Sequence, residues 1–342
     1  MTRRKSRRSS RLTPADLGRD AQSPLQIPRR GWWNILQRVT QRFMGENLSL
    51  VAAGVGFYAL LGLFPAIAAL VTTYGLLFDP AQIQQQFNEL RGIMPAQVHE
   101  LISNQLESAG AGADPALGLG LAGAVILALW GATRGTRALI IALNIAYDER
   151  EKRGFFTLNL VAFGLTLFLV LVLMAGIVAT VAVPIVLNVL NLGGPSATLA
   201  NWLRWPVLAL VALLALAIFY RYGPSRREAR WRWLPLGSVV AGVLWLVASA
   251  LFSFYVANFG AYNATYGSLG AVIVLLLWLY LSAASVIIGA GINAETERQT
   301  ARDSTIGTAR PRGQRGAEVA DRLPGEAPAP GRGREAQGSL AD

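Results

Sequence analysis

The chain has 342 residues, of which 53% are hydrophobic and 15% charged, and its formal net charge is +11. An average soluble domain is about 25% charged, so this chain has too little polar surface for a water-soluble fold. It contains no cysteine and one histidine, which excludes disulfide frameworks, thiol catalysis and multi-histidine metal sites. Because the charges lie in blocks between long uncharged runs, the sequence predicts an all-α, polytopic membrane protein.

Two segments precede the first apolar run. Residues 1–30 are rich in Arg, Ser and Pro, and we expect a disordered basic tail there. Over residues 31–49, Trp32, Leu36 and Val39 recur at helical spacing opposite polar side chains, which predicts an amphipathic helix. This helix either lies on the inner leaflet or packs against the cytoplasmic end of the helix bundle.

Six apolar runs are candidates for membrane spans, each of which needs roughly 20 residues. Together they define a six-helix transmembrane domain over residues 50–294, with spans at about 50–78, 116–133, 158–183, 205–220, 234–259 and 268–294. The acidic outer loop 79–115 is expected to hold short amphipathic helices that cap the bundle. Residues 295–342 have balanced charges and much Gly, Pro and Ala, and are expected to be disordered.

The distribution of basic residues predicts the orientation. Of the 31 Lys and Arg residues, 29 fall in alternate segments between the predicted spans and 2 fall in the others. Basic segments are retained in the cytoplasm, so both termini are expected to be cytoplasmic. The same alternation supports six spans, because one missed helix would scramble it.

Uncharged polar residues cluster where the fifth span meets the sixth. Asn258, Tyr262, Asn263 and Tyr266 occupy the outer end of the fifth span and the short loop after it. They either cap helix ends within an aromatic belt or form the mouth of a substrate cavity.

Other polar candidates lie near the cytoplasmic side. Arg134 and Arg137 are three residues apart on a helix that leaves the second span, and Asn144 follows them. The two arginines either bind phosphate from the cytoplasmic side or merely determine the topology and contact lipid headgroups. Asn293 and Glu295 lie at the inner end of the sixth span, where an ion pair of Glu295 with Arg134, Arg137 or Arg153 is plausible on charge grounds. The first span contains Tyr58 and Pro65, and Pro65 is expected to kink it.

Three blocks of sequence combine these polar positions with small residues. They are residues 52–65 (AAGVGFYALLGLFP), residues 129–147 with LWGATRGTRAL, ALN and AY, and residues 255–295 with YVANF, YNATYGSLG, LWLY and GINAE. In these blocks the chain resembles the YihY family, also called the virulence factor BrkB family, over about residues 30–300. Gly62 departs from the serine usual in that family. The resemblance implies a six-helix bacterial inner-membrane protein with a link to virulence, and some members have carried a ribonuclease BN label.

Two functions fit these features. The first is a transporter or flippase-like exporter of an amphiphilic, anionic envelope molecule, using the kinked first span, the arginines and the outer polar mouth. The alternative is a non-transporting envelope scaffold that binds partners through its basic tails. A nuclease is disfavoured, because the sequence has no carboxylate cluster and no histidine pair. We therefore expect no enzyme activity, no cofactor, no metal and no nucleic-acid partner, with membrane lipids as neighbours.

Overall fold

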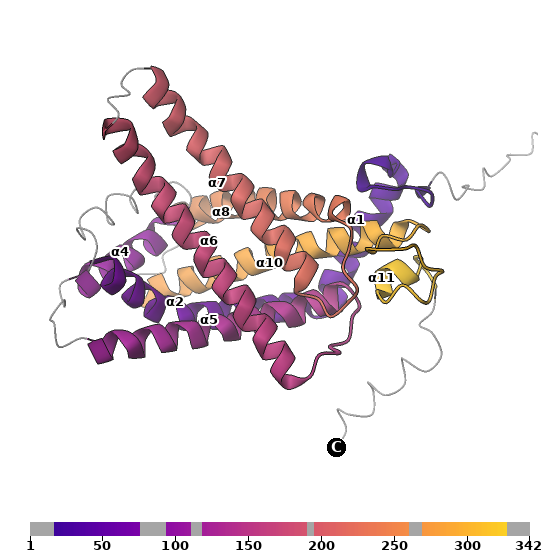
Figure 1. The fold of residues 1–342 in the computed structure, drawn as a ribbon, viewed down its shortest axis with the longest axis horizontal. Helices are drawn as coiled ribbons and strands as arrows, with labels where there is room; N and C mark the ends of the chain where they lie inside the picture. The colour runs from indigo at the N-terminus through magenta and orange to yellow at the C-terminus, as the bar shows by residue number, and fades with distance from the viewer. Residues whose placement is uncertain (1–16, 76–93, 111–117, 190–194, 260–268, 327–342) are drawn as a thin grey trace, which may run out of the picture.

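The computed structural model describes residues 17–75, 94–110, 118–189, 195–259 and 269–326. Within these ranges the fold is helical, and its one β contact is an isolated bridge between Ala229 and Thr305. The elements are η2 (Pro24–Gln26), α1 (Arg29–Gly45), α2 (Leu48–Gly75), α4 (Ala96–Gly110), α5 (Gly118–Ala146), α6 (Phe155–Val189), α7 (Pro195–Tyr222), η5 (Trp231–Trp233), α8 (Pro235–Phe259), α10 (Leu269–Gln299) and α11 (Glu318–Asp321). In Figure 1, α2, α5, α8 and α10 lie along the long axis of the molecule, and α6 and α7 cross them obliquely.

The described helices confirm an all-α protein with several candidate membrane spans. Five are long and apolar enough by length and composition, at Val125–Ala146, Phe155–Gly176, Trp202–Tyr222, Trp231–Asn258 and Leu269–Gln299. A sixth candidate is the pair formed by α1 and the first part of α2, Leu48–Leu63, which meet at an angle of 67°.

Glycine allows α2 and α5 to pack at close range. A Cβ atom built on Gly131 would lie 2.7 Å from the Cα atom of Gly62, and one built on Gly62 would lie 2.9 Å from the backbone nitrogen of Ala132. Small residues that let helix backbones approach are typical of membrane helix contacts. The position that departs from the family pattern, Gly62, therefore has no room for a side chain in this chain.

The second span does not end where the apolar run ends. We expected a span over 116–133, with Arg134 and Arg137 beyond it, but α5 continues without a break to Ala146. The candidate span Val125–Ala146 contains both arginines. The apolar run in the sequence ends at the first charged residue, Arg134. The helix itself continues past Arg134, and Gly135 still packs beside Ala59 of α2.

α1 packs against the bundle, which is the second of the two alternatives weighed for it. Ile35 and Val39 are buried against Ile292 of α10. The buried face overlaps the expected one, since Val39 is buried and Trp32 packs against the same cluster. It is shifted toward Ile35, which is fully buried, and away from Leu36, which is 48% exposed.

One predicted cap of the outer loop falls within the described residues. α4 buries Val98 and Ile102 against Val256 of α8 and Val274 of α10. His99 is 6% exposed in this packing.

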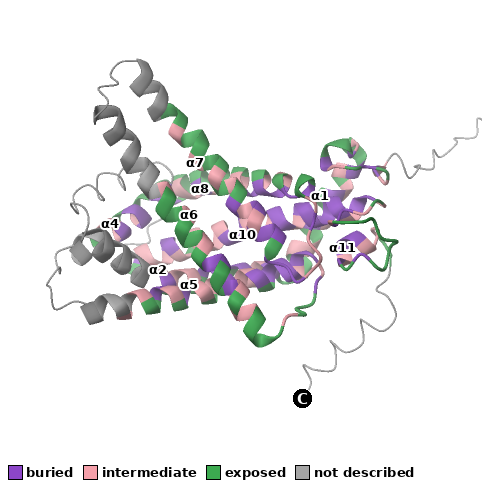
Figure 2. Ribbon diagram, viewed as in Figure 1, coloured by how far each residue is buried: buried purple, intermediate pink, exposed green. Residues whose placement is uncertain are grey.

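α6 and α7 are covered far less than α10. Figure 2 shows long exposed stretches on their described parts and mostly buried residues along the C-terminal half of α10. Exposed apolar side chains such as Leu171 on α6 and Leu210 on α7 are what a lipid-facing surface requires.

The C-terminal tail differs from the prediction of disorder. α10 extends to Gln299, and residues 300–326 fold back over the same end of the bundle, where Ser304, Thr305 and Val319 are fully buried. Arg315 holds this segment by donating to the backbone carbonyls of Ala301 and other residues nearby. Composition could not reveal these backbone contacts. Residues 1–16 and 327–342 lie outside the described residues.

The close contact of α2 and α5 predicts that Gly131→Ala lowers thermal stability. Overpacking of a tight contact costs about 1–3 kcal/mol. The matched control is Gly164→Ala on α6, where an added Cβ meets nothing within 4 Å. Unfolding temperatures of the purified proteins in one detergent should fall for Gly131→Ala and hold for Gly164→Ala. Equal temperatures for both variants would contradict the predicted role of Gly131.

Candidate functional site

Arg134 and Arg137 are cations inside a candidate span. The guanidinium of Arg134 lies over the ring of Trp130, 5.3 Å from its centroid, and the Arg134 side chain is exposed. Arg137 donates to Oδ1 of Asn159 on α6 at 3.1 Å. Neither arginine forms an ion pair with an acidic residue in the part of the chain that the structure describes. Within those described residues, the positive charges of both side chains are therefore uncompensated.

Tyr58 and two threonines lie near the backbone that carries these arginines. The Cβ atom of Tyr58 lies 3.9 Å from the position that a Cβ on Gly135 would take. α2 therefore places Tyr58 directly beside the turn of α5 that carries Arg134 and Arg137, called the arginine turn below. On the side of α6, the hydroxyl of Thr166 donates to Thr136 at 2.8 Å, and both threonines are buried. The arginine turn thus connects α2, α5 and α6 at one level of the bundle.

Glu295 does not pair with the arginines that the sequence suggested. Its carboxylate is 1% exposed and accepts from Arg38 at 2.5 Å and from Arg42 at 3.0 Å, both on α1. Arg42 also reaches Asp148, which follows α5 with a left-handed φ of 56°. Arg298 binds both Asp148 and Glu295. This network ties α1, the end of α5 and the end of α10 together.

A second buried pair joins α10 to the loop between α7 and α8. Arg226 and Glu297 are 1% and 0% exposed and meet through two hydrogen bonds, of 2.6 Å and 3.2 Å. Ser304 donates to the same carboxylate at 2.7 Å, and the ring of Tyr147 lies under the Arg226 guanidinium. Burial disfavours the charged guanidinium, but the adjacent Glu297 carboxylate outweighs it and raises the pKa of Arg226.

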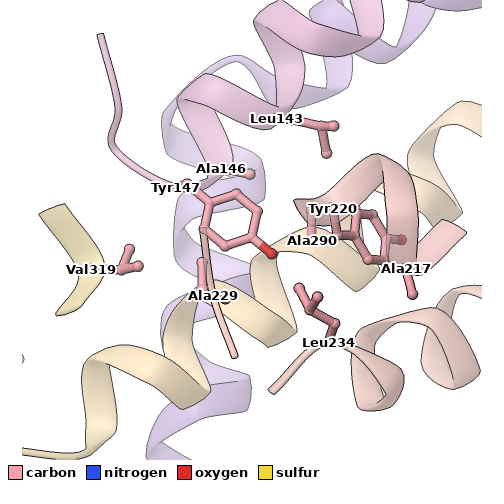
Figure 3. Packing of buried hydrophobic residues seen from close by; sticks show 10 residues of the cluster. Leu143, Ala146, Tyr147, Ala217, Tyr220, Ala229, Leu234, Ala290 and Val319 are labelled. Atoms are coloured by element: carbon pink, nitrogen blue, oxygen red, sulfur yellow. The ribbon is translucent and has the colours of Figure 1, made fainter. Parts of the chain in front are cut away.

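An apolar cluster forms the base of these networks. Figure 3 shows the ring of Tyr147 at its centre, with Val319 of α11 on one side and Tyr220 of α7 on the other. The Tyr220 hydroxyl donates to the carbonyl of Val286 on α10 at 2.8 Å. Burial among apolar side chains and ion pairs holds the ends of α5, α7 and α10 together at this end of the bundle.

Asn144 and Asn293 make hydrogen bonds that organise the backbone. Asn293 is fully buried, accepts from the Gly237 amide at 2.7 Å and donates to the Leu234 carbonyl at 3.1 Å, so it caps the start of α8. Asn144 accepts from the Ser225 amide at 2.7 Å and donates to Glu151 at 2.9 Å.

Glu151, the acceptor of the Asn144 hydrogen bond, stays ionised in this loop. Burial alone would raise its pKa, but hydrogen bonds from Arg153 and Asn144 lower it to about 2.

The outer polar cluster falls mostly outside the described residues. Tyr262, Asn263 and Tyr266 are not described, while Asn258 is exposed near the end of α8 and donates to the Phe254 carbonyl at 2.8 Å. Pro65 lies within the bounds of α2, and its side chain also falls outside the description. The described residues therefore bring together Tyr58, Arg134 and Arg137. They separately bring together Asn144, Asn293 and Glu295 at the end of the bundle where α5, α7 and α10 end, called the polar end below.

Comparison with known proteins decides the family. Residues 39–313 match the virulence factor BrkB family. The chain belongs to this family. The BrkB-family chain is 31% identical over 265 residues to a protein of Bacillus subtilis (strain 168) named "Putative ribonuclease-like protein YfkH", covering 76% of this chain and 94% of that protein. No solved structure matches the chain.

Other relatives of this BrkB-family chain are named UPF0761 membrane protein. One from Rhodospirillum centenum is 26% identical over 270 residues, which cover 76% of this chain and 56% of the relative. One from Idiomarina loihiensis is 31% identical over 97 residues, which cover 28% of this chain and 34% of the relative. The matches thus span less than two thirds of either UPF0761 protein.

Sequence reasoning missed three arginines, Arg38, Arg42 and Arg226. Arg38 and Arg42 are spaced i, i+4 on the polar face of a predicted amphipathic helix, and Glu295 and Glu297 are acidic residues at a predicted cytoplasmic helix end. Basic residues on a polar helix face and acidic residues at a cytoplasmic helix end together indicate that ion pairs form there. The sequence does not show which arginine pairs with which glutamate, because Arg42 and Glu295 are 253 positions apart.

Breaking the Arg226–Glu297 pair is predicted to destabilise the protein strongly. Arg226→Met leaves a buried carboxylate without its cation, which costs about 3–5 kcal/mol. Thermal unfolding in detergent measures the loss, and Arg312→Met, at an exposed pair with Glu326, should cost about 0–1 kcal/mol. The double variant Arg226→Met/Glu297→Leu should regain part of the stability. A single Arg226→Met variant as stable as Arg312→Met would refute this role.

Proposed function

We propose that this BrkB-family membrane protein moves an amphiphilic, anionic envelope molecule across the bacterial inner membrane, as a transporter or flippase-like exporter without enzymatic chemistry. The single observation that carries the proposal is the pair Arg134 and Arg137 inside the candidate span of α5, with no acidic partner among the described residues. An arginine near the middle of a membrane helix costs about 2.5–3.5 kcal/mol on insertion scales, so its retention there points to a ligand pathway.

The depth of the arginines supports a ligand within the membrane. Arg137 and Arg134 precede the last residue of α5, Ala146, by nine and twelve residues. At about 1.5 Å per residue they lie roughly 14 Å and 18 Å from that end of the helix. Arg134 extends over Trp130, one turn further from Ala146, so its charge is directed away from the polar end rather than toward it.

The surroundings of Arg134 suit a molecule with an apolar part. Ile126, Leu127 and Trp130 on the same helix are each more than half exposed. A lipid-like molecule could therefore lay its chains against α5 while its phosphate or carboxylate meets the guanidinium groups.

The orientation proposed is both termini in the cytoplasm with six crossings. The described N-terminal and C-terminal segments bind each other, since Thr300 donates to the carbonyl of Ala21 at 2.6 Å and the Ala301 amide donates to that of Arg19 at 2.7 Å. Ends that meet on one side require an even number of crossings, which α2, α5, α6, α7, α8 and α10 would supply. The excess of basic residues supports the cytoplasm as that side.

Transfer of a fluorescent anionic lipid between leaflets tests the proposal. Proteoliposomes containing the full chain should move NBD-phosphatidylglycerol to the dithionite-accessible leaflet faster than protein-free vesicles, with or without an imposed membrane potential. Arg134→Gln and Arg137→Gln should each slow this transfer by about tenfold or more, because each removes a charge-assisted contact. Arg310→Gln, at an exposed arginine of the C-terminal segment, is the matched control and should leave the rate unchanged.

Two results would oppose the proposal. If the wild-type protein moves no anionic lipid under either condition, the transport function is wrong, and the alternative of a non-transporting envelope scaffold takes its place. If transfer occurs but Arg134→Gln and Arg137→Gln match Arg310→Gln, the arginine turn does not carry it. NBD-phosphatidylcholine measured in parallel shows whether transfer depends on net negative charge.

A further inference from the structure

A pocket separate from the arginine turn opens at the polar end of the bundle. Its volume is about 320 Å³. Its walls come from the residues before α6, the end of α7, the loop at 224–228 and Gly316 of the C-terminal segment. Three stretches of chain that are distant in sequence therefore build one concavity, and the returning C-terminal segment supplies one wall.

The pocket is lined mainly by cations. Five lining residues are basic and one, Glu228, is acidic, the basic set being Lys152, Arg153, Arg221, Arg226 and Arg227. Four of these five have carboxylate partners, because Lys152 pairs with Glu149, Arg153 with Glu151, Arg221 with Glu228 and Arg226 with Glu297. Arg227 is the basic lining residue that remains, and its side chain makes no hydrogen bond or ion pair within the described ranges.

Arg227 is held in place without a charged partner. Its backbone amide donates to the Gly316 carbonyl at 2.9 Å. Its guanidinium lies against Gly307, where a Cβ atom would come within 2.7 Å of Nη2. The Nη1 atom is buried with no hydrogen-bond partner, and so is Nε of the neighbouring Arg221. The fold thus brings to the pocket wall one cation, Arg227, that has no carboxylate partner among the described residues.

A guanidinium that lines a cationic pocket without a carboxylate partner can take an anion as its counter-charge. Native structures pair nearly all buried charged groups with protein, water or an ion. A planar guanidinium fork matches the oxygens of a phosphate group. The volume lies at the lower end of small-molecule sites, which begin at about 300 Å³.

We propose that this cationic pocket binds a phosphate group through Arg227, at the end of the bundle where the described N-terminal and C-terminal segments meet. The group belongs either to a soluble phosphate compound or to a lipid headgroup, which share this chemistry. The proposal does not depend on the transport function, because Arg134 and Arg137 do not line the pocket.

Calorimetric titration of the full chain with sodium pyrophosphate in lipid-free detergent tests the soluble source. We expect saturable binding to the wild-type protein that Arg227→Met weakens by about tenfold or more. The matched control is Arg232→Met, which removes an exposed arginine that does not line the pocket, and should change the affinity by less than about twofold. Ionic strength is held constant throughout.

Nanodiscs distinguish the lipid source. If phosphatidylglycerol nanodiscs weaken pyrophosphate binding relative to phosphatidylcholine nanodiscs, and Arg227→Met abolishes that difference, a headgroup occupies the pocket. Equal affinity in both discs assigns the site to a soluble phosphate. No pyrophosphate binding in either detergent or phosphatidylcholine discs overturns the proposal, as does an equal loss in the Arg227→Met and Arg232→Met variants.

A second variant separates binding from folding. Arg227→Lys keeps the charge but loses the fork, and should bind pyrophosphate with an affinity between those of the wild type and Arg227→Met. The unfolding temperature without ligand should be the same for Arg227→Lys and wild type, with the pyrophosphate-induced rise smaller in the variant. A ligand-induced rise as large as that of the wild type in both Arg227 variants would show that Arg227 does not contact the anion.

Discussion

The burial of two carboxylates at the end of α10 is the constraint on which the rest of the polar end depends. Glu295 and Glu297 are almost completely excluded from solvent, and an unpaired buried carboxylate would shift toward its neutral form or unfold the site. Arg38 and Arg42 bring α1 to Glu295, and Arg226 brings the loop before α8 to Glu297. The positions of α1 and that loop therefore follow from the need to compensate two charges.

The same constraint explains why the C-terminal segment is ordered over residues 300–326. Ser304 completes the coordination of Glu297, and the Glu318 amide donates to Glu149 at 2.7 Å, so the segment supplies donors to carboxylates that the helices bury. Its composition resembles that of a disordered tail because no apolar stripe runs through it. Its order comes from specific hydrogen bonds, which composition does not encode.

The sequence predicted the helices and missed their partners for one physical reason. Hydropathy is a property of each residue by itself, namely its preference for water or for an apolar environment. The pattern of hydropathy along the chain is enough to locate α6, α8 and α10 and to predict an amphipathic α1. Which arginine meets Glu295 is a property of the folded bundle, as is the shift of the buried face of α1 toward Ile35 and away from Leu36. Asn144 and Asn293 were found as polar outliers, yet their hydrogen bonds to Ser225 and Gly237 join segments 81 and 56 residues apart.

The arginine turn of α5 combines a rigid side and a sparsely covered side. On one side, Gly62 and Gly131 lock α2 to α5 at a distance that admits no side chain, so the backbone carrying Arg134 has little freedom to move. On the other side, Asn159 of α6 accepts a hydrogen bond from Arg137 and Thr166 of α6 donates one to Thr136, and much of the remaining surface of α6 is exposed. Under the proposed transport function, a cation fixed on a rigid helix beside a sparsely covered neighbour can meet an anionic group that arrives from the lipid without a rearrangement of the bundle's core. Selectivity for negative charge would then arise from Arg134 and Arg137, while α6 would form the sparsely covered side of the path.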